Sequence, residues 1–297
     1  MTNWSTDRIP NLNGKIAVIT GGNIGLGYQI SLELAKKGAQ IVIACRAKSK
    51  GYSAVEKIEG ILKKKINAEV IPLDLTDLES IYQFASEFGE KYTKLDLLIN
   101  NAGVVNLKDR EETRSGLEMH MATNHYGHFA LTGLLMPFIK KSEKARVVTM
   151  SSGAYRSGII DFDDLNWTKR KYDRLKSYGD SKLANLLFVM ELKRYFQKNN
   201  IRAISVAAHP GLSATERQQS IGIGGKLSKW FAQPVSMGAL PSLLAATDIN
   251  VKSGEYYGPK WAIRGYPKLE KVKPIVSDED LAKKLWEVSE KITGIKY

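Results

Sequence analysis

Tyr178 and Lys182 stand four positions apart in the segment Tyr178-Gly-Asp-Ser-Lys182, which we expect to be helical. Side chains four positions apart lie on one face of a helix, so the phenol and the ammonium would be neighbours. A nearby ammonium favours the phenolate and would lower the pKa of Tyr178 from its usual value of about 10. Tyr178 could then act as a general acid or base. The spacing is also frequent by chance, so other segments must support it.

A glycine-rich segment, Thr20-Gly-Gly-Asn-Ile-Gly-Leu-Gly27, separates an apolar run from a segment with apolar residues at helical spacing. A strand, a glycine turn and a helix in this order form a phosphate site. Gly21 would permit the tight turn, while Gly25 and Gly27 would let a pyrophosphate approach the backbone and the helix pack closely. The free N–H groups at the start of the helix would attract the anion. The alternative is an ordinary strand-to-helix turn.

Arg46 follows the second apolar run, at residues 39–45. Dinucleotide sites that prefer NAD carry an acidic residue near this place, which binds the ribose 2′-hydroxyl. An arginine can instead bind a 2′-phosphate through charge-assisted hydrogen bonds. The hypothesis is therefore that NADP(H) is preferred and that NAD(H) is possible. The alternative is a surface arginine at a strand end.

Apolar runs and amphipathic segments alternate along the chain. We expect strands at residues 15–19, 39–45, 68–75, 95–101, 145–150 and 201–207. We expect helices at residues 28–37, 50–64, 77–92, 117–141, 178–197 and 277–292, the fourth with a break near Pro137 and the last capped by Ser277. Such alternation predicts an α/β fold with a doubly wound, Rossmann-type parallel sheet in a single domain over residues 1–297. Ligands bind at the carboxyl ends of the strands in such sheets, where the polar motifs stand.

Together these segments resemble the short-chain dehydrogenase/reductase family over about residues 12–216. The motifs that carry the resemblance occur in the family's order: Thr20-Gly-x-x-x-Gly-x-Gly27, Asp74, Asn100-Asn-Ala-Gly103, Asn124, Ser152, Tyr178-x-x-x-Lys182 and Pro210-Gly-x-x-x-Thr215. Three more segments are similar to the retinol dehydrogenase and protochlorophyllide reductase-like branch: Ala44-Cys-Arg46, Asn124-His-Tyr-Gly-His-Phe129 and Ser181-Lys-Leu-Ala-Asn185. The start at Trp4 and two late segments, Tyr256-Tyr-Gly258 and Gly265-Tyr-Pro-Lys268, resemble soluble bacterial oxidoreductases of that branch.

The resemblance implies hydride transfer between a nicotinamide cofactor and a carbonyl or alcohol carbon. Four residues would be catalytic. Tyr178 would donate or accept the proton, and Ser152 would hydrogen-bond the substrate oxygen. Lys182 would bind the nicotinamide ribose, and Asn124 would hold a helix kink and a water that links Lys182 to solvent. The resemblance and the motifs above together imply a cofactor-binding set: Thr20, Gly21, Asn23, Ile24, Gly25, Gly27, Arg46, Asp74, Leu75, Asn101, Ala102, Gly103, Tyr178, Lys182, Pro210, Gly211 and Thr215.

Two segments depart from the regular pattern. Residues 158–176, between Ser152 and Tyr178, are rich in charge and are interpreted as an inserted, solvated surface loop. Residues 212–235 are interpreted as the variable substrate loop, because the family places its substrate loop there. The glycines and the pair Trp230-Phe231 suggest a lid over a lipophilic substrate, although the same residues could be packed in an exposed loop or touch a membrane surface.

Composition limits the classes of function. The formal net charge is +13, but the lysines are scattered and match no nucleic-acid motif, so we expect no nucleic-acid partner. One cysteine, Cys45, excludes an internal disulfide and fits a cytoplasmic location. The start has no signal-peptide pattern, and no apolar stretch reaches the length of a membrane span. The histidines His120, His125 and His128 lack a partner set for a metal, so no metal site is expected.

The leading hypothesis is an NADP(H)-dependent oxidoreductase acting on a lipophilic carbonyl or alcohol. A non-catalytic cofactor-binding sensor, a light-dependent chlorin reductase and a nucleic-acid binder are the alternatives. The sequence does not identify the substrate or the direction of the reaction. Family members often pair through the two long helices expected here at residues 117–141 and 178–197, so a homodimer is also expected.

Overall fold

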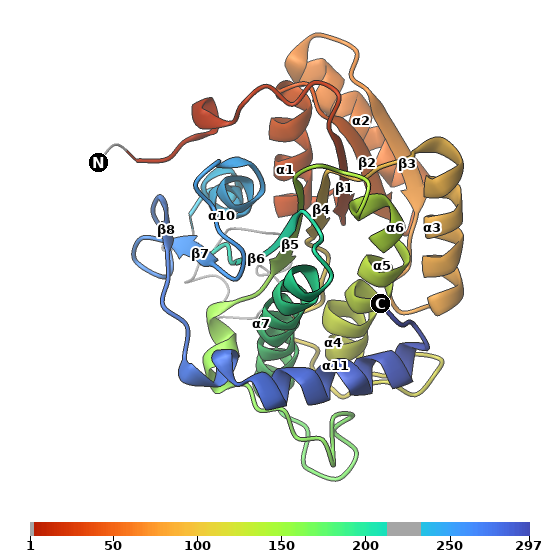
Figure 1. Cartoon of the computed structure of the whole chain (residues 1–297), viewed down its shortest axis with the longest axis vertical. Coiled ribbons are helices and arrows are strands. Elements are labelled where there is room, and N and C mark those ends of the chain that lie inside the picture. Colours follow the sequence, from red (N-terminus) through yellow and green to blue (C-terminus); the bar gives the residue numbers. More distant parts are fainter. Residues whose placement is uncertain (1–2, 213–232) are drawn as a thin grey trace.

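The computed structural model describes residues 3–212 and 233–297. Within these residues one sheet of eight strands runs in the order β3-β2-β1-β4-β5-β6-β7-β8 (Figure 1). The strands are β1 (Ile16–Thr20), β2 (Gln40–Cys45), β3 (Ala68–Pro72), β4 (Leu97–Asn100), β5 (Ala145–Met150), β6 (Ala203–Ala208), β7 (Tyr256–Pro259) and β8 (Pro267–Leu269). All neighbouring strands pair in parallel except β7 and β8, which are antiparallel. The predicted doubly wound sheet is confirmed.

Helices cover both faces of the sheet because successive strand residues point to opposite sides. In β1, Ala17 and Ile19 join the core shared with α1 (Gly25–Lys36), α2 (Lys48–Leu62) and α10 (Val235–Thr247). Val18 joins the core on the other face, shared with α3 (Leu78–Lys91), α5 (Gly127–Leu134) and α7 (Arg174–Lys198). Strands buried on both faces read as continuous apolar runs, which is why the first six were predictable. The short β7 and β8, and α10, were not predicted.

The helix expected at residues 117–141 is broken into pieces. It consists of α4 (Met119–Met121), the π-helical turn η2 (Ala122–Tyr126), α5, and α6 (Met136–Ile139). The π-helical turn contains Asn124, so the distortion lies at the residue for which a helix kink was expected. Among the described residues there are also short 3-10 turns: η1 (Thr6–Arg8), η3 (Gly153–Ser157) and η4 (Pro274–Ser277).

Two helix starts differ from the prediction. Helix α7 begins at Arg174, four residues before Tyr178, because the Asp173 carboxylate accepts hydrogen bonds from the backbone of Leu175 and Lys176. The last helix, α11 (Glu279–Thr293), is capped by Asp278 and not by Ser277, since the Asp278 carboxylate accepts from the Leu281 amide.

The C-terminal helix α11 packs across α7 and α5 (Figure 1). Its Trp286 stacks on Phe188 and Tyr195 of α7, with ring centroids 5.8 and 6.0 Å away, and meets Phe129 of α5 at 5.0 Å. The expected dimer was to pair through these two helices. The face that these helices turn toward α11 is covered by that helix, and the pairing itself stays a prediction.

Candidate active site

The glycine turn after β1 is built as the spacing predicted. Gly21 and Gly25 have positive φ angles of 64° and 57°, which glycine adopts without strain. A Cβ on Gly27 would lie 2.2 Å from the Gly21 carbonyl oxygen and 2.6 Å from the Asn101 amide nitrogen. The start of α1 therefore packs directly on the turn, which only glycine permits.

The N-terminus of α1 is open to an anion. Its N-cap residue, Ile24, supplies no side-chain hydrogen bond, and the first turn holds no acidic residue. Three other long helices of the described chain, α3, α7 and α11, are each capped by an aspartate. Uncapped N–H groups at a positive dipole end, beside glycines, fit a pyrophosphate group.

Thr20 has a different place from the one expected. Its side chain is fully buried, and its hydroxyl accepts hydrogen bonds from the backbone N–H groups of Asn101 and Ala102 at 2.8 and 2.9 Å. It also lies 2.9 Å from His128 Nε2. The Thr20 side chain thus joins the ends of β1 and β4, and the assignment of Thr20 to the cofactor site stays a prediction. His128, which the sequence analysis did not assign to the site, supports this junction.

Three residues at the end of β5 and on α7 form the chemical centre. Ser152 follows β5, and its side chain lies near enough to Tyr178 to lower the pKa of that phenol. The Lys182 ammonium lies 5.5 Å from the centre of the Tyr178 ring and donates to the Met150 carbonyl at 3.2 Å. The neighbouring Ser151 is buried and donates to the Lys182 carbonyl, so Ser152 is the serine that meets the tyrosine.

The pKa shifts in this centre differ from the expectation for Tyr178. Burial raises the pKa of Tyr178, and the hydrogen bond with Ser152 opposes that rise only in part. Burial lowers the pKa of Lys182 to about 7, because the ammonium loses its hydration. The prediction that Lys182 lowers the pKa of Tyr178 is wrong for this structure, in which burial is the largest cause of the shift and raises that pKa.

Asn124 connects the centre to the segment after β4. Its amide oxygen accepts from the Val104 N–H at 2.8 Å, and its amide nitrogen donates to the Val104 carbonyl and to Ser181. A Cβ on Gly103 would lie 2.8 Å from the Asn124 oxygen and 3.6 Å from the Lys182 ammonium. Gly103 thus allows the backbone to pass close to both side chains.

The residues expected at the adenosine end lie around the ends of β2 and β3. Arg46 is exposed and makes no hydrogen bond or ion pair with another described residue, while the adjacent α2 starts without a capping side chain. The Asp74 carboxylate accepts from the backbone and hydroxyl of Thr76. Asp74 and Leu75 line a cleft of about 560 Å³ that extends to Arg114, Gly127 and the end of α11.

Beyond β6, the turn at Pro210 and Gly211 is held by His209. The Gly211 N–H donates to His209 Nδ1 at 3.2 Å, so this histidine supports the turn. The Gln233 amide donates to the Pro210 carbonyl and its backbone N–H to Leu212, so the two ends of the expected substrate loop lie side by side. Thr215 and Trp230-Phe231 lie outside the described residues.

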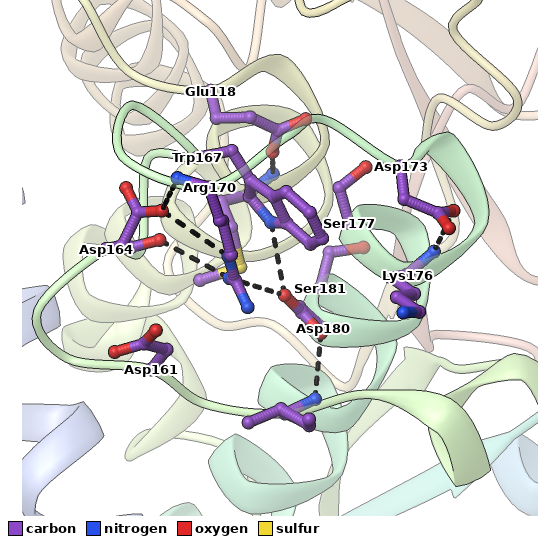
Figure 2. Close-up of polar contacts among 12 residues, drawn as sticks. Glu118, Asp161, Asp164, Trp167, Arg170, Asp173, Lys176, Ser177, Asp180 and Ser181 are labelled. Carbon is purple, nitrogen blue, oxygen red and sulfur yellow. Dashed lines mark hydrogen bonds and ion pairs between the residues drawn. The ribbon is translucent and has the colours of Figure 1, made fainter.

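The inserted segment between Ser152 and Tyr178 is packed, contrary to the solvated loop expected. Trp167 is buried, and the Arg170 guanidinium stacks on its ring at 3.7 Å. The Asp164 carboxylate, also buried, accepts from three successive backbone N–H groups, at residues 168–170. Figure 2 shows Trp167 and Arg170 reaching toward Asp180 of α7, to which both donate. The buried carboxylate of Asp164 is paired with Arg170, which also pairs with Asp180, while Lys169, Lys171 and Lys176 are exposed.

No cluster of three or more histidine, cysteine or acidic side chains suited to a metal ion occurs among the described residues. Each of His120, His125 and His128 is buried beside a hydroxyl or carboxyl partner. Of the helices described, none is long and apolar enough to cross a membrane.

Known proteins are similar to this chain in sequence and in fold. The family described as short chain dehydrogenase matches residues 15–224. Retinol dehydrogenase 13 from Homo sapiens is 38% identical over 95% of this chain and 86% of its own length, and retinol dehydrogenase 12 from Mus musculus is 39% identical over 96% and 88%.

Solved structures of other proteins have a similar fold. An uncharacterized protein from Mycobacterium paratuberculosis superposes with a TM-score of 0.85 at 35% identity, covering 100% of this chain and 99% of the other. A short chain dehydrogenase from Shigella flexneri, complexed with NADP, shares the fold with a TM-score of 0.68 at 21% identity, covering 84% of this chain and 99% of its own.

Proposed function

The chain belongs to the short-chain dehydrogenase family of oxidoreductases, and from this premise we propose that it transfers a hydride between NADP(H) and a lipophilic carbonyl or alcohol. The observation that carries the proposal is the buried Lys182 beside the Tyr178 ring, with Ser152 near the phenol, at the strand ends that also carry the glycine turn. When bound, the nicotinamide supplies or accepts the hydride.

The chain's residues fit such a cofactor. The uncapped start of α1 and the glycine turn would hold the pyrophosphate, because Gly27 lets the start of the helix pack on the turn and the free N–H groups there attract an anion. Lys182 would hold the nicotinamide ribose, and Asp74 and Leu75 would border the adenine. Asn101, Ala102 and Gly103 would line the path between them.

Tyr178 would donate the proton in carbonyl reduction. Burial keeps this phenol protonated at neutral pH, which suits a proton donor. Ser152, which lies near Tyr178, would share the substrate oxygen with it and hold that oxygen in line for proton transfer. Asn124 would keep the segment after β4 in place beside Lys182 through its paired hydrogen bonds with Val104.

The preference for NADP(H) rests on Arg46. Its guanidinium is exposed at the end of β2, next to the uncapped start of α2, and both would attract a 2′-phosphate. An acidic residue, which would repel that phosphate, is absent from this place and from the first turn of α2.

The proposed substrate class is a lipophilic aldehyde, ketone or alcohol. Relatives more than a third identical over nearly the whole chain are named retinol dehydrogenases, so retinaldehyde and retinol are the first compounds to test. We also propose a single-domain protein located in the cytoplasm, where the lone Cys45 would stay reduced.

A fluorescence titration with NADPH and with NADH tests the cofactor part of this proposal. We expect tight NADPH binding, weaker NADH binding, and NADPH-dependent reduction of retinaldehyde or another long-chain aldehyde that Tyr178→Phe abolishes. Equal affinities for the two cofactors would remove the Arg46 argument but leave the oxidoreductase. Binding of neither cofactor by folded protein would contradict the proposal as a whole.

A further inference from the structure

A buried carboxylate–imidazole pair lies next to Tyr178, outside the residues assigned above to the reaction. Glu118 and His120 are both 0% exposed, and Glu118 Oε1 is 3.0 Å from His120 Nδ1. The His120 ring meets the Tyr178 ring edge-to-face, with centroids 5.8 Å apart and planes at 63°. The resemblance to dehydrogenases assigned no role to either residue of the pair.

Glu118 is placed to hold the imidazole in one orientation. Its Oε2 accepts from the Met121 backbone N–H at 2.8 Å, and its Oε1 accepts from the Tyr172 hydroxyl at 3.4 Å. Burial raises the pKa of Tyr172 to about 12, so this hydroxyl remains a donor at neutral pH. A carboxylate facing Nδ1 favours the tautomer with the proton on Nδ1, which donates to it. His120 Nε2 is buried and has no hydrogen-bond partner among the described residues. The ring is therefore fixed through its Nδ1 edge.

The inserted segment holds this pair and α7 at the same time. Its Tyr172 contacts Glu118 and His120, and the Asn166 side-chain oxygen accepts from the Glu118 backbone N–H at 3.1 Å. The same segment binds Asp180, two residues beyond Tyr178, through donors from Ile159, Trp167 and Arg170 (Figure 2). The segment thus contacts the surroundings of Tyr178 both through His120 and through the next residues of α7.

We propose that His120 is a positioning residue for Tyr178, and that Glu118 together with Tyr172 of the inserted segment keeps its ring in place. The inference rests on the proposed role of Tyr178 as proton donor. A phenol can rotate about two side-chain bonds, and a ring packed against it restricts where its hydroxyl lies. Misplacing a reacting group by about 1 Å can cost on the order of 100-fold in rate. Loss of His120 should therefore slow the chemical step without weakening cofactor binding.

The alternative is that His120 is simply a buried histidine of the core. His125 provides a matched control for this alternative. It is equally buried, one turn further along the chain, with Nε2 2.9 Å from the Ser289 hydroxyl of α11. It packs against Phe129 and Phe188 and not against Tyr178. Losing a core histidine without a catalytic connection should lower stability in both variants alike.

The test compares His120→Asn with His125→Asn. Asparagine can keep a donor near Nδ1 for Glu118 while it removes the ring that meets Tyr178. We measure kcat and KM for NADPH with the best aldehyde substrate, and the midpoint of thermal unfolding. For His120→Asn we expect kcat to fall by about tenfold or more with KM for NADPH unchanged within about twofold. For His125→Asn we expect kcat within about twofold of the unaltered protein.

A second variant covers the case in which His120→Asn does not fold. Tyr172→Phe removes only a half-buried hydroxyl, and we expect a smaller loss of kcat, about threefold, with KM for NADPH unchanged. In the double variant His120→Asn/Tyr172→Phe, kcat should fall no further than in His120→Asn, because residues that act through one contact are not additive.

Three outcomes would overturn the inference. The first is an unchanged kcat in His120→Asn, or in Tyr172→Phe if the former does not fold, while Tyr178→Phe is inactive. The second is an equal loss of kcat and of unfolding midpoint in His120→Asn and His125→Asn, which would make His120 a core residue only. The third is full activity in Tyr178→Phe, which would refute the proposed function itself and this inference with it.

Discussion

Replacing Lys182 by methionine should change how the stability of the protein depends on pH. Lys182 is 4% exposed, and the contact described for its ammonium is with a neutral carbonyl, 3.2 Å away on Met150. Burial lowers its pKa to about 7, against about 10.4 in an unfolded chain. Between these values the unfolded chain keeps a proton that the folded chain has lost. The free energy of unfolding therefore rises with pH in this window, and the cost of the buried charge is fully present below about pH 7.

The size of the effect follows from the slope of this linkage. One proton of difference changes the free energy of unfolding by about 1.36 kcal/mol per pH unit, so the rise from pH 7 to pH 9 should be about 2–3 kcal/mol. Above pH 9 the buried Cys45 thiol, whose pKa is raised by burial, begins to act in the opposite direction. The window of pH 7 to 9 therefore isolates the lysine best.

Urea unfolding of both proteins at pH 7, 8 and 9, without cofactor, measures this rise. We expect Lys182→Met to be the more stable protein at pH 7, and the difference between the two to shrink by about 2–3 kcal/mol at pH 9. Parallel pH curves for the two proteins would refute the assignment of a low pKa to Lys182.

Three further predictions follow from the site and its surroundings. Arg46→Asp should weaken NADPH binding by about tenfold or more, because one charge-assisted contact at an exposed position, worth about 1.5 kcal/mol, is lost. NADH binding should be unchanged or stronger. An unaltered ratio of the dissociation constants for NADPH and NADH would contradict this. Gly27→Ala should abolish tight cofactor binding, because its Cβ would lie 2.2 Å from the Gly21 carbonyl oxygen. Gly60→Ala is the control: its Cβ would meet nothing within 4 Å, so this variant should bind the cofactor as tightly as the unaltered protein. Light scattering should give a monomer of about 33.1 kDa, because α11 covers the face expected to pair, and a mass of twice this value would show that pairing uses another face or displaces the helix.

The sequence predicted the parts of the fold that local patterns determine. The first six strands are buried on both faces, so each reads as an apolar run in the sequence. The glycines of the turn after β1 could be recognised because the close packing there leaves no room for a Cβ atom. The paired motif Tyr178 and Lys182 could be found because a fixed spacing on one helix places both at one site.

Other features depend on contacts between distant segments and were missed. Thr20 was assigned to the cofactor because of its place in a motif, but its hydroxyl is buried against the backbone after β4. The pKa of Tyr178 was predicted from its neighbour Lys182 alone, whereas burial, which a sequence does not display, dominates. The charged residues around Arg170 indicated solvation, since nothing local reveals that Arg170 pairs with Asp180 of α7. The short β7 and β8 carry too few residues to show a pattern.

The measurement that tests the central claim most directly is transfer of deuterium from NADPH labelled at the reactive carbon of the nicotinamide. The labelled cofactor and retinaldehyde, or the best aldehyde of a panel, are incubated with the protein, and the alcohol product is analysed by mass spectrometry. We predict one deuterium on the former carbonyl carbon, and no labelled product with Tyr178→Phe. Unlabelled alcohol, or equal labelling by Tyr178→Phe, would contradict hydride transfer assisted by Tyr178.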